Sequence, residues 1–125
     1  CWCGRNGCME TWLSGSGLER DHAEVTGEDR SGQDIAAAAD AGDAAARSSM
    51  ARHLSRLARG LAHVVNLIDP GVIILGGGLS NLPHLYKDLP EAMRPYVFCQ
   101  SWSIDIKPPL HGDDSGVRGA ARLWD

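Results

Sequence analysis

The feature that most constrains this chain is a long apolar stripe that ends at a proline. Between Asp43 and Pro70, apolar residues recur at spacings of three and four: Met50, Leu54, Leu57, Leu61, Val64, Val65 and Ile68. This spacing places them on one face of an amphipathic helix. Asp43 is a typical N-cap residue, and Pro70 cannot continue a helix. We therefore expect the longest element here, with a solvated face that carries Arg47, Arg52, Arg56 and Arg59.

A short, wholly apolar run follows this helix in "GVIILGGG". The β-branched stretch Val72–Leu75 predicts a strand buried on both faces. Gly76, Gly77 and Gly78 end the strand, and a helix should follow with Pro83 in its first turn. A strand, glycines and a helix N-terminus form a common platform for phosphate groups. The spacing matches neither the G-x-G-x-x-G fingerprint nor a Walker loop, so nucleotide contact and a purely structural turn both stay open.

The remaining segments alternate between helix and strand signals. We expect a short helix near Leu18–Val25 and an alanine-rich helix capped by Ser31. Pro90 and Pro95 should bracket a further short helical turn. The alternating segment "SIDIK" predicts an edge-like strand, and a last helix should begin at Asp114 or Ser115. This order of loop, helices, strand, helix, strand and helix predicts an α/β fold.

Three of the four cysteines lie in the opening segment "CWCGRNGCME". Cys1 and Cys3 can point the same way in an extended chain, and Gly4 and Gly7 allow a turn that returns Cys8 to the same point. Three converging thiolates fit structural Zn²⁺, which takes a fourth ligand. None of the five histidines has a suitable spacing, so we expect that ligand upstream, in a longer protein. Disulfides are the less favoured alternative, because neighbouring cysteines this close bridge only with strain.

Charge and hydropathy exclude several classes of partner. The formal net charge of −4 comes from mixed acidic and basic residues without a basic stripe, which argues against a nucleic-acid surface. A long apolar run that would suggest membrane insertion is absent from the sequence.

Among single residues, we expect His63 and Cys99 to be buried and His22 to be exposed. Asp113 and Asp114 are expected to cap a helix rather than to bind a metal.

Together these segments resemble the ROK family of sugar kinases and sugar-responsive repressors. "CWCGRNGCME" resembles the zinc motif of that family, "DPGVIILGGGLSN" its strand and glycine loop, and "HGDDSGVRGAARLW" its closing helix. The resemblance covers essentially the whole chain. It implies the actin-like, ribonuclease-H-like fold, of which residues 1–125 would be the C-terminal portion. Within it we expect a zinc and sugar loop (1–12), a helical segment (13–70) and a strand–helix–strand–helix segment on the nucleotide side (71–125).

The resemblance also implies roles for particular residues. A structural zinc ion would be bound by Cys1, Cys3 and Cys8, with a histidine from an upstream segment. Glu10 matches the glutamate that hydrogen-bonds sugar hydroxyls in the family. The loop that lies against the nucleotide of Mg²⁺-ATP would consist of Gly76, Gly77 and Gly78. No catalytic residue is expected in this chain, because the phosphate-binding loop and the proton-accepting aspartate would lie upstream.

The function that this resemblance implies is ATP-dependent phosphorylation of a hexose, at carbon six. The wording around "LAHVVNLIDP" and "SGVRGAARLW" favours a fructokinase. We expect a cytoplasmic homodimer that binds no nucleic acid or membrane, and a chain that is inactive by itself. The first alternative is the effector-binding module of a sugar-responsive repressor, behind an upstream helix-turn-helix. A weaker alternative is a free-standing zinc-binding interaction module.

Overall fold

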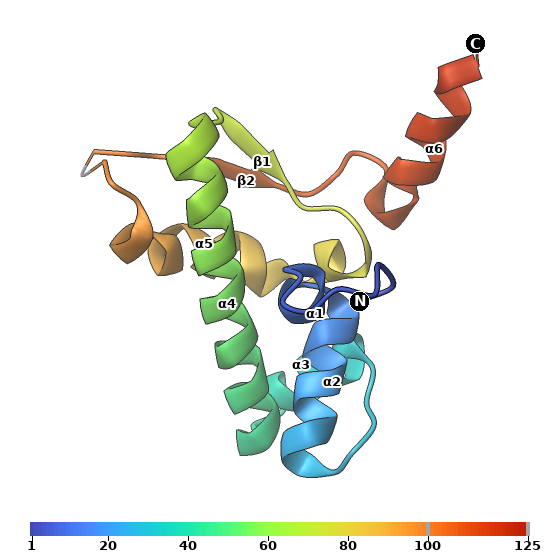
Figure 1. Ribbon diagram of the computed structural model, residues 1–125. Coiled ribbons are helices and arrows are strands. Elements are labelled where there is room, and N and C mark those ends of the chain that lie inside the picture. Colours follow the sequence, from blue (N-terminus) through green and yellow to red (C-terminus); the bar gives the residue numbers. More distant parts are fainter. Residues whose placement is uncertain (100, 125) are drawn as a thin grey trace.

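The computed structural model describes residues 1–99 and 101–124, apart from the side chain of Asp113. A long helix, α4 (Ala44–Ile68), forms the axis of a mixed α/β arrangement (Figure 1). The predicted cap is confirmed, because Asp43 Oδ1 accepts the amides of Ala45 and Ala46 at 2.9 and 3.0 Å. The helix ends where predicted, just before Asp69 and Pro70. Within the described part of the chain, no helix is both long and apolar enough to cross a membrane.

Three helices precede α4 and pack beside it: α1 (Glu10–Leu13), α2 (Gly15–Thr26) and α3 (Gly32–Asp40). The sequence predicted α2 only from Leu18 onward. Its earlier start follows from Ser14, whose hydroxyl accepts the amide of Gly17 at 3.1 Å and so caps the helix. The predicted cap of α3 is confirmed, since Ser31 Oγ accepts the amide of Asp34 at 3.1 Å.

The second half of the chain forms a strand–helix–strand unit of β1 (Val72–Ile74), α5 (Pro83–Met93) and β2 (Asp105–Lys107). The strands are parallel, and Ile73 pairs with Ile106. On α5, the side chains of Leu85, Leu89 and Met93 are buried in the core.

The predicted burial of the first strand on both faces is wrong in this structure. Val72 and Ile74 are 44 % and 61 % exposed. Ile73, which alternates with them, packs against the core. Among the described residues, the small sheet is therefore covered on one face only.

Two further expectations about helices need correction. Pro90 lies inside α5 and Pro95 lies inside the 3-10 turn Arg94–Tyr96, so the two prolines do not bracket a helical turn. The last helix, α6 (Ser115–Ala121), begins as predicted, but Asp114 makes no capping bond with its side chain. α6 stands away from the other helices (Figure 1). The expected cap at Asp113 lies outside the described side chains.

Several single-residue expectations are wrong because helix pairing was not visible in the sequence. His22 is buried, since α2 packs against α4 and its Nδ1 lies 3.0 Å from Ser49 Oγ. His63 is exposed, and so is Cys99. Arg52 and Arg56 do not form a solvated face, because α2 covers that side of α4 and both guanidinium groups bond to it.

Candidate functional site

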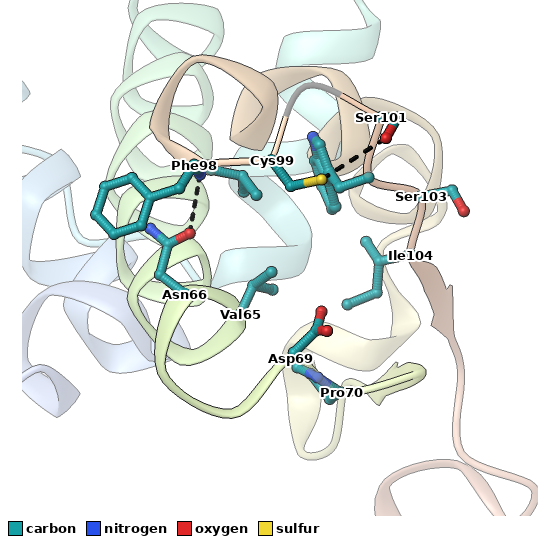
Figure 2. A pocket seen from close by; sticks show the side chains of 11 residues that line it. Val65, Asn66, Asp69, Pro70, Phe98, Cys99, Ser101, Ser103 and Ile104 are labelled. Atoms are coloured by element: carbon teal, nitrogen blue, oxygen red, sulfur yellow. Dashed lines mark hydrogen bonds between the residues drawn. The ribbon is translucent and has the colours of Figure 1, made fainter.

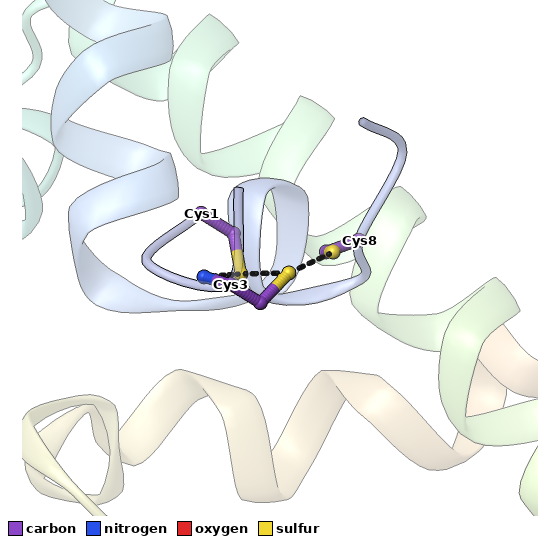
Figure 3. A group of neighbouring side chains, drawn as sticks. All are labelled: Cys1, Cys3 and Cys8. Carbon is purple, nitrogen blue, oxygen red and sulfur yellow. Dashed lines mark hydrogen bonds between the residues drawn. The ribbon is translucent and has the colours of Figure 1, made fainter. Parts of the chain in front are cut away.

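The three N-terminal cysteines converge as predicted (Figure 3). The sulfur atoms of Cys1 and Cys3 are 3.2 Å apart, those of Cys3 and Cys8 are 3.3 Å apart, and all three lie within 4.8 Å of one another. Positive φ angles of 72° at Gly4 and 77° at Gly7 turn the chain back on itself. The four cysteines, all within the described residues, are free thiols, so the disulfide alternative is not realised.

The chemistry of this cluster fits three ligands of a zinc site. A tetrahedron with Zn–S bonds of about 2.3 Å separates its sulfur atoms by roughly 3.8 Å, so the thiols found 3.2 and 3.3 Å apart would move slightly apart to hold the ion. A backbone hydrogen bond at Arg5 and the thiol of Cys8 lower the pKa of Cys3, which favours the thiolate that a metal needs. In the described residues no histidine, aspartate or glutamate joins the three cysteines. The fourth ligand therefore stays a prediction.

Glu10 and the glycine triplet, which are far apart in the sequence, line the same cleft. Glu10 is the first residue of α1, directly after the cysteine loop, and the triplet follows β1. The cleft encloses about 620 Å³. Its walls are Met9, Glu10, Leu13, Ser14, Gly15, Ser16, Gly76, Gly77, Gly78 and Leu79. The structure therefore brings together the two groups of residues that the sequence predicted for sugar and nucleotide.

The glycine triplet presents bare backbone to the cleft. Gly77 has φ 74° and ψ −173°, a conformation that is essentially restricted to glycine. A Cβ atom built at any position of the triplet would meet no atom within 4 Å. A ligand can therefore approach this backbone closely, as the sequence argument for a phosphate platform requires.

The segment Ser14–Ser16 also lines the cleft, which was not predicted from the sequence. This segment is the capped start of α2, so free backbone N–H groups and the positive end of the helix dipole face the same space as Glu10. The available signal was the run "SGSG", in which a serine cap precedes small residues that leave room for a ligand.

A network of charged side chains lies beneath α1. Asp21, on α2, is bonded by Arg52 Nη2 at 2.7 Å and by Arg56 Nη1 at 2.6 Å. Burial alone would raise the pKa of Asp21, but the hydrogen bonds and positive charges of the two arginines outweigh it and hold that pKa below its usual value. Arg56 also lies over the ring of Trp12, with its Cζ 4.8 Å from the ring centroid. The network therefore links α2 and α4 to α1.

A second cavity, of about 450 Å³, lies where the C-terminal end of α4 faces the segment that leads into β2 (Figure 2). The amide of Asn66 joins the two walls, because it donates to Tyr96 O at 2.8 Å and accepts the amide of Phe98 at 3.0 Å. Cys99 lines this cavity, with its Sγ 3.7 Å from Ser101 Oγ. The cavity is separate from the cleft and contains none of the residues predicted for zinc, sugar or nucleotide.

The arrangement as a whole is similar to solved structures with the actin-like α/β fold. A ROK family glucokinase from Streptomyces griseus, in complex with glucose and AMPPNP, superposes with a TM-score of 0.83 at 29 % identity. The match covers 98 % of this chain and 46 % of that one. The ROK hexokinase from Thermus thermophilus gives a TM-score of 0.78 at 33 % identity, over 97 % of this chain and 41 % of that one. The predicted α/β class is thereby confirmed.

The chain belongs to the ROK family, whose sequence model matches residues 1–125. The N-acetyl-D-glucosamine kinase of Vibrio vulnificus (strain YJ016) is 38 % identical over 123 residues, 98 % of this chain and 41 % of that protein. The enzyme of the same name from Pasteurella multocida (strain Pm70) is 39 % identical over 125 residues, 99 % of this chain and 41 % of that protein. The resemblance inferred from the motifs is thereby confirmed, and the chain spans about 41 % of the length of these relatives.

Proposed function

We propose that this chain is the C-terminal part of an ATP-dependent hexose kinase. The observation that carries the proposal is the shared cleft, because Glu10 and the glycine triplet line one space large enough for a ligand. A kinase must hold its two substrates side by side, and these residues are the ones matched to sugar and nucleotide. The kinase names of the relatives support this reading over the repressor and the free-standing zinc module.

Each part of the cleft has a proposed role. The Glu10 carboxylate accepts hydrogen bonds from sugar hydroxyls, and the bare backbone of the glycine triplet lies against ATP with its Mg²⁺. Zinc bound by Cys1, Cys3 and Cys8 would supply no chemistry but would hold the loop before Glu10 rigid. The proton acceptor and the phosphate-binding loop are proposed to come from another part of the protein. Phosphoryl transfer depends on these groups, so the chain alone should be inactive.

The proposed substrate is a hexose phosphorylated at its carbon-six hydroxyl. The segments "LAHVVNLIDP" and "SGVRGAARLW" favour fructose, because they resemble those of fructokinases. The names of the relatives point instead to N-acetylglucosamine and glucose. A panel of these three sugars, assayed with ATP on the full-length protein, discriminates among them by kcat/KM. A full-length protein that binds one of the sugars and a DNA operator but releases no ADP would instead be the repressor.

The assembly and location of the whole protein are also proposals. We expect a homodimer in the cytoplasm, as the family resemblance implies. The clustered free thiols suit a reducing compartment, because such thiols persist where disulfides are not formed. Size-exclusion chromatography with light scattering on the full-length protein would measure the oligomeric state.

The role of Glu10 is tested by Glu10→Gln in the full-length protein. The amide cannot accept charge-assisted hydrogen bonds, each of which contributes about 1.5–3 kcal/mol, so KM for the sugar should rise roughly 10- to 100-fold. KM for ATP should change little. Glu91→Gln is the matched control, because the Glu91 side chain is 77 % exposed on α5, away from the cleft. If the two variants had equal sugar KM, Glu10 would not be the sugar ligand.

A further inference from the structure

The helix that carries Glu10 is too short to hold its own position. α1 has four residues, and none of these described residues is buried. An isolated helix of this length is not stable in water, because a single turn does not offset the cost of nucleation. The position of Glu10 in the cleft must therefore be set by the surfaces on which α1 packs, which belong to α2 and α4.

One of these surfaces is at Gly60, on α4. A Cβ atom at Gly60 would lie 2.5 Å from Leu13 Cδ1 and 2.9 Å from Met9 Cε. Met9 and Leu13 are four residues apart, on one side of the helical turn that begins at Glu10. The terminal methyl groups of both side chains therefore occupy the space that a side chain at position 60 would take. Gly60 leaves the room in which the ends of Met9 and Leu13 pack on the long helix.

A second contact is a hydrogen bond from the interior of the protein. His53 Nε2 lies 3.1 Å from the carbonyl oxygen of Leu13, and the His53 side chain is buried. Burial lowers the pKa of His53, so the ring is neutral at pH 7 and Nε2 carries the proton that it donates to this carbonyl. His53 therefore fixes the C-terminal end of α1.

A third contact comes from Arg56, which lies over the Trp12 ring while its Nη1 bonds to Asp21. The carboxylate holds the guanidinium group by this hydrogen bond, and the guanidinium group packs over the indole. His53, Arg56 and Gly60 are spaced by three and four residues, so they share one face of α4.

We infer that His53, Arg56 and Gly60 form an α1-binding face on α4 that positions Glu10 toward the sugar, with Asp21 holding Arg56. These are positioning residues, because none of them lines the cleft. The inference rests on the proposed function and adds to it a second support for Glu10, independent of zinc. A displacement of about 1 Å at a binding group can cost as much as 100-fold in rate, so a small shift of α1 is sufficient to be measured.

The first experiment compares Gly60→Ala with Gly32→Ala in the full-length protein. Gly32 is also helical, but a Cβ there would make only ordinary contacts at 3.8 Å. Gly60→Ala should raise KM for the sugar about 10- to 100-fold while KM for ATP and the melting temperature stay near those of Gly32→Ala. Adding Leu13→Ala to Gly60→Ala removes the nearer clashing methyl groups and leaves Met9 Cε. Because Leu13 also lines the cleft, the double variant is compared with Leu13→Ala alone, and its sugar KM should come close to that of the single Leu13 variant. Equal sugar KM for Gly60→Ala and Gly32→Ala would overturn the inference.

A second pair of variants keeps the test decisive if Gly60→Ala does not fold. His53→Ala removes the donor to Leu13 O, whereas the side-chain amide of His53→Gln places an N–H near the position of Nε2. Sugar KM should rise in His53→Ala and be largely restored in His53→Gln, and equal values in both would also overturn the inference. Glu10→Gln distinguishes a failure of the proposed sugar contact from a failure of the α1-binding face. If it leaves sugar KM unchanged, the proposed role of Glu10 fails, and if it alone raises sugar KM, only the α1-binding face fails.

Discussion

Asp21 shows how a single buried charge determines the arrangement of three helices. Its side chain is 9 % exposed and accepts hydrogen bonds from Arg52 and Arg56. Arg52 also bonds to Ser49, and Arg56 lies over the Trp12 ring. A buried carboxylate is tolerated only when it is paired in this way. The consequence is that α2 and α4 cannot slide past each other without leaving this charge unpaired.

Asp21→Asn should therefore destabilise the protein measurably. The amide keeps the shape but loses charge-assisted bonds to two arginines, so the free energy of unfolding should fall by about 1–3 kcal/mol, as measured by urea denaturation of the full-length protein. Glu91→Gln, which breaks only an exposed pair with Arg94, should cost less than about 1 kcal/mol. Equal losses in the two variants would show that the Asp21 network adds no stability.

The burial of His53 makes the stability of the protein depend on pH. The pKa of His53 is lowered below 6.5, chiefly by burial, so the unfolded chain takes up a proton that the folded one resists. This contribution to stability is complete above the unfolded pKa of about 6.5, and it is lost as pH falls from there toward the folded pKa. The melting temperature should drop between about pH 7.5 and about pH 5.5, and it should drop less in His53→Gln. The same slope in both proteins would contradict the assignment.

At the scale of elements, signals carried within a few residues were predictable. Asp43 and Pro70 bound α4, and Ser31 caps α3, because caps and breakers act on their own backbone neighbours. The helix break predicted at Pro90 was wrong. Leu85, Leu89 and Met93 hold α5 in the core, and their burial outweighs the local cost of a proline.

The wrong predictions about helices and strands concern which of their faces pack against another element. His22 is covered by α4, and Val72 and Ile74 are left uncovered. Both outcomes depend on the packing of one element against another. The composition of a single segment does not indicate which element will pack against it. The periodicity of the α4 stripe located the core at Met50, Leu57 and Val65, but Val64 and Ile68 of the same stripe are exposed. It also did not predict that α2 would cover Arg52 and Arg56.

The glycine loop after β1 makes a prediction of its own. Gly77→Ala places a Cβ in a conformation that costs about 1–3 kcal/mol for residues other than glycine, so the loop should be destabilised and KM for ATP should rise. Gly76→Ala is the control for stability, because Gly76 has no positive φ and its Cβ would meet nothing within 4 Å. Thermal unfolding and ATP titration of both variants would check this. A Gly77→Ala protein as stable as Gly76→Ala would refute the role of this conformation.

At the scale of the whole molecule, the chain exposes large apolar side chains at several places, among them Leu67, Ile68, Phe98 and Trp124. Under the proposed function, part of this surface faces the remainder of the enzyme, which also supplies the proton acceptor. We expect the isolated 125-residue chain to release no ADP from ATP with any sugar of the panel, under conditions where the full-length protein does so. A coupled ADP assay measures this, and sugar-dependent release by the chain alone would refute the division of roles.

The candidate site was predictable only in its separate pieces. The thiols of Cys1, Cys3 and Cys8 and the neighbouring Glu10 lie within one motif, and the glycine triplet lies within another. Their meeting in one cleft was not predictable from local patterns, because it depends on how α4 and β1 return the chain to its beginning. The α1-binding face was not predictable either. Gly60 has no side chain whose apolar character would indicate a contact, and in a helix glycine is expected only to lower stability.

The distance in sequence between the two walls of the cleft also sets when the cleft can form. Glu10 and the glycine triplet share no local contacts, and the entropic cost of bringing chain segments together grows with the length of the intervening loop. The helices before β1 can pair early through nearer neighbours, whereas the cleft must wait until β1 and α5 have docked. During refolding, ligand binding should therefore return later than helix content, so the last part of this protein to assemble would be the part that recognises its substrates.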